Sequence, residues 1–400
     1  MSEDYSKEEY EMLLEVIKDF KGKRKLVKRA KKVISGASRK QVDSPERVQK
    51  FYDREKERME GSLNRNYSIY RVMTPDDAEA VGDDIDPSLP DTEIAPQLDD
   101  AALPDDIDDD TSPIETDPDI TLESIINESN DLLSIETLEI GMAVSKSIGL
   151  VNVGQLRKGT GFLIGHNLMM TNWHNFKIKS DTNTSSLLMG FEDNDVGERL
   201  GKAEYDFDPD RFFYSNKEND VAIVAVKPKS RKGVALEKYM HIPLFEREGK
   251  IIIGEPVNII QHAGGHRKQV VFHNSNLVAL SNKSEKDQYC YYDGDTKKGS
   301  SGSPVFNKHW EVIALHRKGV PETTRFGKIV LKDNTKIDRS EMMTNMHKIK
   351  WASNQGVRIS RIIDNLKKEK FESEETELVM QNYKTLRDDL LLSWGVQVLT

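Results

Sequence analysis

The sequence has one cysteine and no long apolar run, and each scarcity excludes a class of protein. Cys290 is the only cysteine in 400 residues, which excludes an intramolecular disulfide framework and favours a reducing compartment. No stretch of eighteen apolar residues occurs, which argues against a membrane-spanning helix. The N-terminal stretch MSEDYSKEEYEMLLEVIKDF carries acids where a secretory signal has a basic start. We therefore expect a soluble, cytoplasmic protein without a membrane partner.

Basic residues are absent from residues 75–120, which hold eighteen Asp or Glu and seven of the fourteen prolines. The formal net charge of −10 therefore leaves +8 on the rest of the chain. With so few apolar side chains the segment cannot offset the entropy of ordering, and its like charges keep it extended. We predict a disordered acidic linker over 71–120 that divides the chain.

The residues before this linker have helical periodicity. Apolar side chains recur at helical spacing in EYEMLLEVIKDF, KRKLVKRAKKVISG continues the pattern, and Ser44-Pro45-Glu46 is typical of a helix start. We predict a helical N-terminal module over 1–70 with a regulatory or adaptor role. Eight Lys or Arg within 21–32 fit either a nucleic-acid or acidic-partner patch or a solvated helix face. No aromatic side chains are interleaved, so we favour the solvated face and expect no nucleic-acid partner.

The chain after the linker changes from helical to β texture. Residues 121–137 predict a connecting helix, and from about residue 140 short apolar runs such as GTGFLIG, DVAIVAV and EVIALH alternate with Gly and Asn. Many short strands at even spacing favour an antiparallel sandwich or barrel over a parallel sheet. Residues 371–400 return to helical spacing and predict a C-terminal helical tail.

The strongest chemical signal is the hexapeptide Gly299-Ser300-Ser301-Gly302-Ser303-Pro304. The glycines around Ser301 allow a sharp turn in which backbone N–H groups converge beside its hydroxyl. Amides that converge next to a nucleophile are what acyl transfer requires to hold a developing oxyanion. The donors would be the N–H groups of Gly299 and Ser301. Alone, such a hexapeptide is more often only a turn.

Two further residues stand at the ends of apolar strands. His174 follows the run GTGFLIGHNLMMTNW, and Asp220 begins DVAIVAV. Singly, such a histidine is usually a buried structural residue and such an acid a turn residue. Together with Ser301 they give the chain order His, Asp, Ser, and the three signals support one another.

These residues resemble the chymotrypsin-like (trypsin-fold) serine proteases, closest to the bacterial glutamyl endopeptidase branch. The likeness lies in GTGFLI with TNWH, in DVAIVAV, and in GSSGSPVFN with EVIALH, and it covers about residues 138–365. It implies a mainly β fold of two antiparallel β-barrels over 138–370, closed by a C-terminal helix in GVRISRIIDNL. It also implies a serine endopeptidase without cofactor, in which Ser301 attacks the carbonyl, His174 transfers the proton and Asp220 orients the imidazole. The alternative is a catalytically silent scaffold of this fold that binds a partner protein.

The resemblance extends to a specificity pocket and has one departure. Many relatives have Asp before the nucleophile where this chain has Ser300, so the ion pair that activates secreted zymogens is not expected. Thr296 and His316 match the positions that bind the substrate carboxylate in glutamyl endopeptidases, which implies cleavage after acidic residues. A small or apolar preference is the alternative. Four nearby cations either add a positive field or are solvated: Lys297, Lys298, Arg317 and Lys318.

Two weaker motifs do not predict a cofactor or metal site. His262, His266 and His273 are candidate metal ligands, but Gly-Gly separates the first two, which prevents an i, i+4 pair on a helix. No Cys or carboxylate completes a set, so no metal is expected. The glycines of GTGFLIG lack the dinucleotide-binding spacing and the helix that should follow it.

A protease inside a cell needs restraint, and the N-terminal module and linker are the regions available to provide it. By analogy with bacterial signalling and antiviral defence systems, we expect a protein substrate. We also expect an upstream activating protease or sensor protein that acts through residues 1–70.

We predict that the acidic linker is cut, as in a zymogen, either by this enzyme (autoprocessing) or by an upstream protease. An extended, proline-interrupted segment can enter a protease cleft without prior unfolding, and tethering raises its effective concentration to the order of millimolar. On gels, Ser301→Ala should lose any self-made fragments, and full-length protein should be less active than a chain starting near Thr121. Equal activities together with an intact linker in active samples would identify the linker as a spacer.

Overall fold

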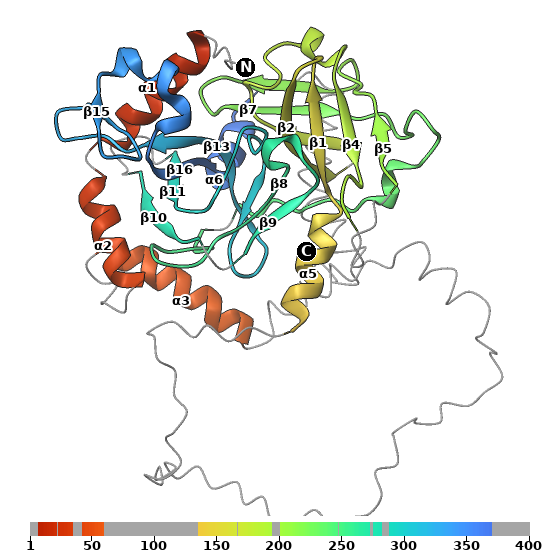
Figure 1. Cartoon of the computed structure of the whole chain (residues 1–400). Coiled ribbons are helices and arrows are strands. Elements are labelled where there is room, and N and C mark those ends of the chain that lie inside the picture. Colours follow the sequence, from red (N-terminus) through yellow and green to blue (C-terminus); the bar gives the residue numbers. More distant parts are fainter. Residues whose placement is uncertain are drawn as a thin grey trace, which may run out of the picture. The chain divides into compact units, whose positions relative to one another are not determined.

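Two antiparallel sheets of seven strands each carry most of the β structure. The structure, a computed structural model, describes residues 7–21, 23–34, 42–59, 135–165, 167–193, 201–246, 248–272, 275–281 and 288–369. The predicted linker over 71–120 and tail over 371–400 lie outside these residues. The predicted mainly β, two-barrel fold is confirmed by the two sheets (Figure 1).

The first sheet has the strand order β5-β4-β1-β2-β3-β7-β6. Its strands are β1 Ile148–Val153, β2 Arg157–Gly165, β3 Leu168–Thr171, β4 Ser186–Met189, β5 Ala203–Tyr205, β6 Phe213–Asn216 and β7 Val221–Ala225. The short 3₁₀ turns η4 Lys179–Thr182 and η5 Leu236–Lys238 lie in the loops that follow β3 and β7.

The second sheet has the order β10-β11-β16-β13-β12-β8-β9. Its strands are β8 Asn258–Gln261, β9 Gln269–Val271, β10 Leu277–Leu280, β11 Tyr289–Tyr292, β12 Pro304–Phe306, β13 Val312–Pro321 and β16 Trp351–Arg358. A separate hairpin pairs β14 Ile329–Val330 with β15 Lys336–Ile337, and three 3₁₀ turns complete this half: η6 Ala263–Gly265, η8 Arg339–Glu341 and η9 Met343–Lys348. The helix α6 Ile359–Leu366 follows β16, where the sequence predicts the closing helix.

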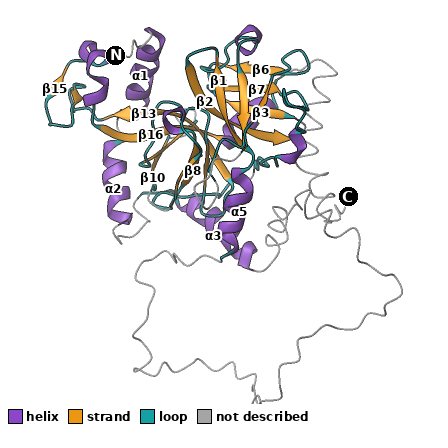
Figure 2. Ribbon diagram, turned by 45° about the vertical axis from the view of Figure 1, so that its right-hand side comes forward, coloured by secondary structure: helices purple, strands orange, loops and turns teal. Residues whose placement is uncertain are grey.

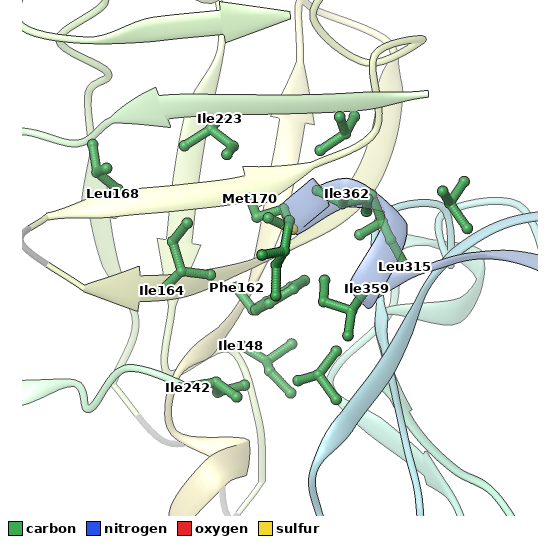
Figure 3. Close-up of a cluster of buried hydrophobic side chains, with 14 of the residues drawn as sticks. Ile148, Phe162, Ile164, Leu168, Met170, Ile223, Ile242, Leu315, Ile359 and Ile362 are labelled. Carbon is green, nitrogen blue, oxygen red and sulfur yellow. The ribbon is translucent and has the colours of Figure 1, made fainter. Parts of the chain in front are cut away.

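Both faces of the first sheet are buried, which explains its continuous apolar runs. In β7, Ile223 faces the cluster that joins the two sheets (Figure 3), whereas Val224 faces a second cluster inside the first sheet. In β2, Phe162 lies in the cluster between the sheets and Leu163 in the cluster inside the first sheet, because successive side chains in a strand point to opposite faces. Ile359 on α6 belongs to the cluster between the sheets and packs there with strands of both.

The first two of the three N-terminal helices share a buried cluster with the second sheet. The three helices are α1 Lys7–Phe20, α2 Arg24–Ile34 and α3 Pro45–Met59, and they belong to the same compact unit as both sheets. α1 packs on β13 and α2 on β10 (Figures 1 and 2). The predicted apolar face of α1 is buried as a set: Met12, Leu13, Val16, Ile17 and Phe20. The module boundaries themselves stay a prediction.

The helix before the first strand lies later than the sequence indicates. α5 spans Glu136–Ser145, so the chain is helical for about five residues beyond the point, near residue 140, where we expected β-strands to begin. The predicted connecting helix over 121–137 falls mostly outside the described residues. Burial of Ile140 and Val144 at helical spacing explains the extension, and Trp310 Nε1 donates to the carbonyl of Thr137 at 2.7 Å. No helix among the described residues is both long and apolar enough to cross a membrane.

The basic stretch 21–32 is mostly surface, with one exception. Lys23 is buried, donates to the carbonyl of Asp19, and lies over the ring of Tyr291. In α2, Arg24 is half-buried and donates to Thr323 Oγ1 at 2.6 Å, whereas the other five cations are exposed: Lys25, Lys28, Arg29, Lys31 and Lys32. This arrangement agrees with the solvated helix face that the sequence analysis favoured.

Among the ion pairs that join α3 to the rest of the protein, two differ strongly in burial, which predicts different contributions to stability. Arg54 pairs with Glu311 where the side chains are only 4% and 5% exposed, whereas Lys50 pairs with Glu248 at 56% and 44% exposure. Arg54→Ala leaves a carboxylate buried and should lower the free energy of unfolding by about 3–5 kcal/mol. The matched control Lys50→Ala should lower it by roughly 0–1 kcal/mol. Urea unfolding at pH 7 measures both, and equal losses would contradict the role assigned to burial.

Candidate functional site

His174 and Asp220 meet because their strands are neighbours. β3 and β7 pair antiparallel, with Thr171 opposite Ala222, so the residues after β3 lie beside the residue before β7. His174 Nδ1 lies 2.9 Å from Asp220 Oδ1 and 3.0 Å from Oδ2, and its backbone N–H donates to Oδ1 at 3.1 Å. The structure therefore brings together these two predicted site residues.

The Asp220 carboxylate is ionised although it is 1% exposed. Burial by itself would raise its pKa, but the neighbouring His174, the hydrogen bonds from that residue and the Arg317 guanidinium together hold the pKa below its usual value. The residue also has a φ of +44°, an uncommon conformation that Asp tolerates better than most side chains. Asn172 Nδ2 donates to its carbonyl at 3.0 Å and so fixes this turn.

The Ser301 loop packs against the first sheet. Thr160 of β2 donates its N–H to the Ser301 carbonyl at 2.8 Å, and Thr171 Oγ1 donates to the Thr160 carbonyl at 2.8 Å. Gly302 has a φ of +89°, and a Cβ there would lie 2.1 Å from the Thr160 oxygen. Only glycine allows this approach, which brings the loop up to the strands that carry His174.

Two amides of the Ser301 loop differ from their neighbours in their backbone hydrogen bonds. The N–H groups of Ser300, Gly302 and Ser303 all donate to carbonyls. Among the backbone hydrogen bonds of the described residues, none has Gly299 or Ser301 as donor. The predicted pair of oxyanion donors is therefore the pair without a backbone acceptor. Gly299 needs its glycine, since it has a φ of +99° and an added Cβ would lie 2.6 Å from the His262 carbonyl.

The Ser301 hydroxyl is directed to β13 in this state. Ser301 Oγ donates to the Arg317 carbonyl at 3.3 Å, and no hydrogen bond to His174 occurs within the described part of the chain. Catalytic hydrogen bonds are often long or absent in ligand-free structures and tighten when substrate binds. The structure thus packs the Ser301 loop on Thr160 and Thr171, three residues before His174, without joining the polar atoms of Ser301 and His174.

Thr296 and His316, the predicted pocket residues, flank two neighbouring strands. Thr296 Oγ1 donates to Asn354 Oδ1 at 2.6 Å, and His316 Nδ1 lies 2.7 Å from Tyr292 Oη. Tyr292 and Asn354 stand opposite each other in the β11–β16 pair. Burial lowers the pKa of His316 to about 3, so its imidazole is neutral at pH 7, and burial also keeps Tyr292 protonated by raising its pKa well above the usual value.

Sequence reasoning missed the role of Arg317. The structure does not leave it solvated: its side chain is 4% exposed and its Nε lies 3.1 Å from Asp220 Oδ2. Lys297 and Lys298 are exposed, which agrees with the alternative that these cations are solvated. The available signal was an arginine two residues after the apolar run VIAL, on the same predicted strand, where a buried charge requires a partner.

The histidines considered as metal ligands do not form a cluster in the described chain. His262 Nδ1 lies 2.9 Å from the carbonyl of His266, and burial lowers the pKa of His262 to about 4. His273 lies outside the described residues. Among the residues that the structure describes, no group of three His, Cys, Asp or Glu side chains is placed to hold a metal ion.

The two antiparallel sheets and the His–Asp pair are consistent with the trypsin fold, and a family comparison agrees over part of the chain. Residues 159–315 match the family model described as "Trypsin-like peptidase domain". This match contains all three predicted triad residues and confirms the trypsin-fold part of the resemblance. The glutamyl endopeptidase branch stays a prediction.

The individual proteins that resemble this chain share low sequence identity with it. "Uncharacterized protein y4fB" of Sinorhizobium fredii is 31% identical over 255 residues, which are 60% of this chain and 38% of that protein, so the chain spans well under half of it. The Rv3671c protease of M. tuberculosis, in its inactive form, superposes with a TM-score of 0.37 at 15% identity, covering 57% of this chain and 90% of that one. Deg5 gives a TM-score of 0.33 at 17% identity, covering 47% and 88%.

Proposed function

We propose that the protein is a serine endopeptidase in which His174, Asp220 and Ser301 act as a catalytic triad. The observation that carries the proposal is the contact of His174 Nδ1 with both oxygens of a buried, ionised Asp220. This contact fixes the tautomer that leaves Nε2 free to accept a proton from the nucleophile. The Ser301 loop, which packs on Thr160 and Thr171, would supply the hydroxyl.

The reaction follows from these positions. Ser301 Oγ attacks the scissile carbonyl while His174 takes its proton, and the N–H groups of Gly299 and Ser301 stabilise the negative oxygen that forms. His174 then returns the proton to the leaving amine. Water repeats the sequence on the acyl-enzyme and releases the second product. Asp220 keeps its negative charge throughout and stabilises the imidazolium.

We further propose that the substrate residue before the cleaved bond is acidic. If Tyr292 donates its hydroxyl proton to His316 Nδ1, the ring proton of this neutral imidazole lies on Nε2 and can be donated to a carboxylate. Asn354 holds the Thr296 hydroxyl on the neighbouring strand. The His316 Nε2–H would offset part of the cost of burying a substrate carboxylate, and Thr296 would add a second donor once its hydroxyl turns from Asn354 to the substrate.

The position of α1 supports regulation by the N-terminal module. β12 pairs with β13 only as far as Leu315, and the Ser301 loop bonds the backbone of His316, so the edge of β13 without a strand partner in the described sheet begins at Arg317 and is suited to an extended substrate. α1 packs on this strand, where Lys318 Nζ lies 3.5 Å from the carbonyl of Glu9 and from Met12 Sδ. Glu8 also pairs with Lys177, three residues after His174.

This packing bears on how linker cleavage would act. Removing residues 1–65 outright would uncover apolar side chains of the second sheet, because Val16, Phe20 and Val33 complete its buried cluster. A cleaved but complete protein is therefore the better test of activation than a shortened chain. Activation would then consist of α1 leaving β13 while both fragments remain present.

The alternative function is a catalytically silent scaffold that binds a partner protein. The direction of the Ser301 hydroxyl, toward the Arg317 carbonyl, is the observation in its favour. A fluorophosphonate probe separates the two functions, because it forms a covalent bond only with an activated serine.

Substitution of the triad should abolish turnover. We expect Ser301→Ala and His174→Ala each to lower kcat by roughly 10⁴–10⁶-fold, with the double variant little worse, since the residues act as a unit. Asp220→Asn should be nearly as damaging through the wrong tautomer. Peptidase assays and probe labelling measure this, and Ser300→Ala, which removes the neighbouring hydroxyl, should still label. Full activity in Ser301→Ala would refute the proposal.

Cleavage of a denatured proteome should follow Glu or Asp. Loss of one hydrogen bond to a charged group costs about 1.5–3 kcal/mol, so His316→Ala should lower the preference for acidic residues by roughly tenfold to over a hundredfold. Sequencing of the cleavage products gives the profile. His347→Ala, which alters an exposed histidine of η9, is the control and should keep the wild-type profile. A profile dominated by Lys, Arg or large aromatic residues would contradict this specificity.

A further inference from the structure

The Asp220 carboxylate has two sides, and a cation occupies the second. Oδ1 receives the His174 backbone N–H, while Oδ2 receives the Nε–H of Arg317 at 3.1 Å. Both members of this ion pair are almost fully buried, at 1% and 4% side-chain exposure. A buried carboxylate without such a partner is strongly disfavoured. Arg317 therefore stabilises the charged form on which the proposed mechanism depends.

Arg317 is itself fixed from three further directions. Its Nη1 donates to Gln355 Oε1 on β16 at 3.1 Å, and its Nη2 donates to Glu15 Oε2 on α1 at 3.1 Å. The guanidinium carbon lies 5.5 Å from the centre of the Tyr289 ring. A planar group held at all three nitrogens has one orientation, which directs Nε at Oδ2. A lysine ammonium could not satisfy these partners simultaneously.

We propose that Arg317 is a positioning residue of the catalytic reaction: it holds the Asp220 carboxylate in place against His174 and partly balances its charge. The proposal rests on the proposed peptidase function and adds to it a fourth side chain that acts through Asp220 and does not touch substrate. Because Nη2 is held by α1, the same residue links the carboxylate to the N-terminal helix.

Arg317 affects the imidazole in two ways that can be measured separately. As a positioning group it keeps the carboxylate aligned, and misplacement of a catalytic group by about 1 Å can cost roughly 100-fold in rate. As a cation it opposes the build-up of positive charge on His174. Removal of the cation leaves Asp220 unbalanced and favours the imidazolium. The acid limb of the kcat/KM profile, which reports protonation of the catalytic base, should then move to higher pH.

Other charged and titratable side chains surround Arg317 and Asp220, and they are the same in the wild type and in its variants. The groups that face this pair are Glu8, Glu9, Glu15 and Asp19 on α1, Lys177 after β3, Tyr289 on β11, and His316 and Lys318 on β13. Since none of them changes between the proteins compared, a difference in the acid limb reports the charge at position 317.

The test compares Arg317→Met and Arg317→Lys with wild type in the full chain, with rates divided by the fraction of protein that a fluorophosphonate labels. For Arg317→Met we expect kcat to fall by roughly 10–100-fold, the acid limb to rise by about half to one pH unit, and KM to stay within about twofold. Arg317→Lys keeps the charge, so its acid limb should match wild type while kcat falls by about tenfold. A merely structural role would lower the labelled fraction and leave the acid limb in place.

The control is Arg157→Met, which removes an exposed arginine that donates to the His174 carbonyl at 3.0 Å without contact to Asp220. Its acid limb should stay at the wild-type pH, since exposed charges are screened. A wild-type kcat and acid limb in Arg317→Met, or an equal rise in Arg157→Met, would overturn the proposal. If Arg317→Met does not fold, Arg317→Lys decides, and a wild-type kcat there overturns it. A wild-type protein that neither labels nor cleaves would refute the peptidase function itself, and the role of Arg317 falls with it.

Discussion

The burial of one negative charge organises this protein. Asp220 precedes β7 and is buried, and there an unpaired carboxylate would cost far more than folding can offset. Two groups compensate it, His174 from the neighbouring strand and Arg317 from the other sheet. The carboxylate is thus the point at which both sheets and, through Glu15, the first helix meet. An ion pair of this kind contributes less to stability than to defining one arrangement of its partners.

The N-terminal helices are part of the same arrangement. Leu13 and Ile17 of α1 share a buried cluster with Ile349 and Leu331, while Val16 and Phe20 join the interior of the second sheet. A helix with both apolar anchors and polar contacts to β13 is held firmly, so its release requires a driving force from outside. An activating partner that supplies such a force stays a prediction, as does the cytoplasmic location.

Local signals explain why much of the fold was predictable. The residue pattern of β7, apolar at every position, indicates a strand covered on both faces, and the structure shows it between two clusters. Ser44-Pro45-Glu46 indicates a helix start because its chemistry acts within one turn, and α3 begins at Pro45. The start of the catalytic region was less predictable. The end of α5 depends on the packing of Gly141 against the Trp310 ring, about 170 residues away in the chain, and such a contact leaves no local pattern.

The sequence by itself determined the sheet class, the order His174, Asp220, Ser301, and the glycines around the nucleophile. Each of these depends on periodicity, turn chemistry or short spacing, which act between near neighbours. Only the tertiary structure decided that Arg317 turns inward to Asp220, that Tyr292 contacts His316, and that α1 lies on β13. A charge in a strand is compatible with solvent or with a buried partner. The choice depends on which distant strand brings the opposite charge within reach, and therefore on the assembled fold.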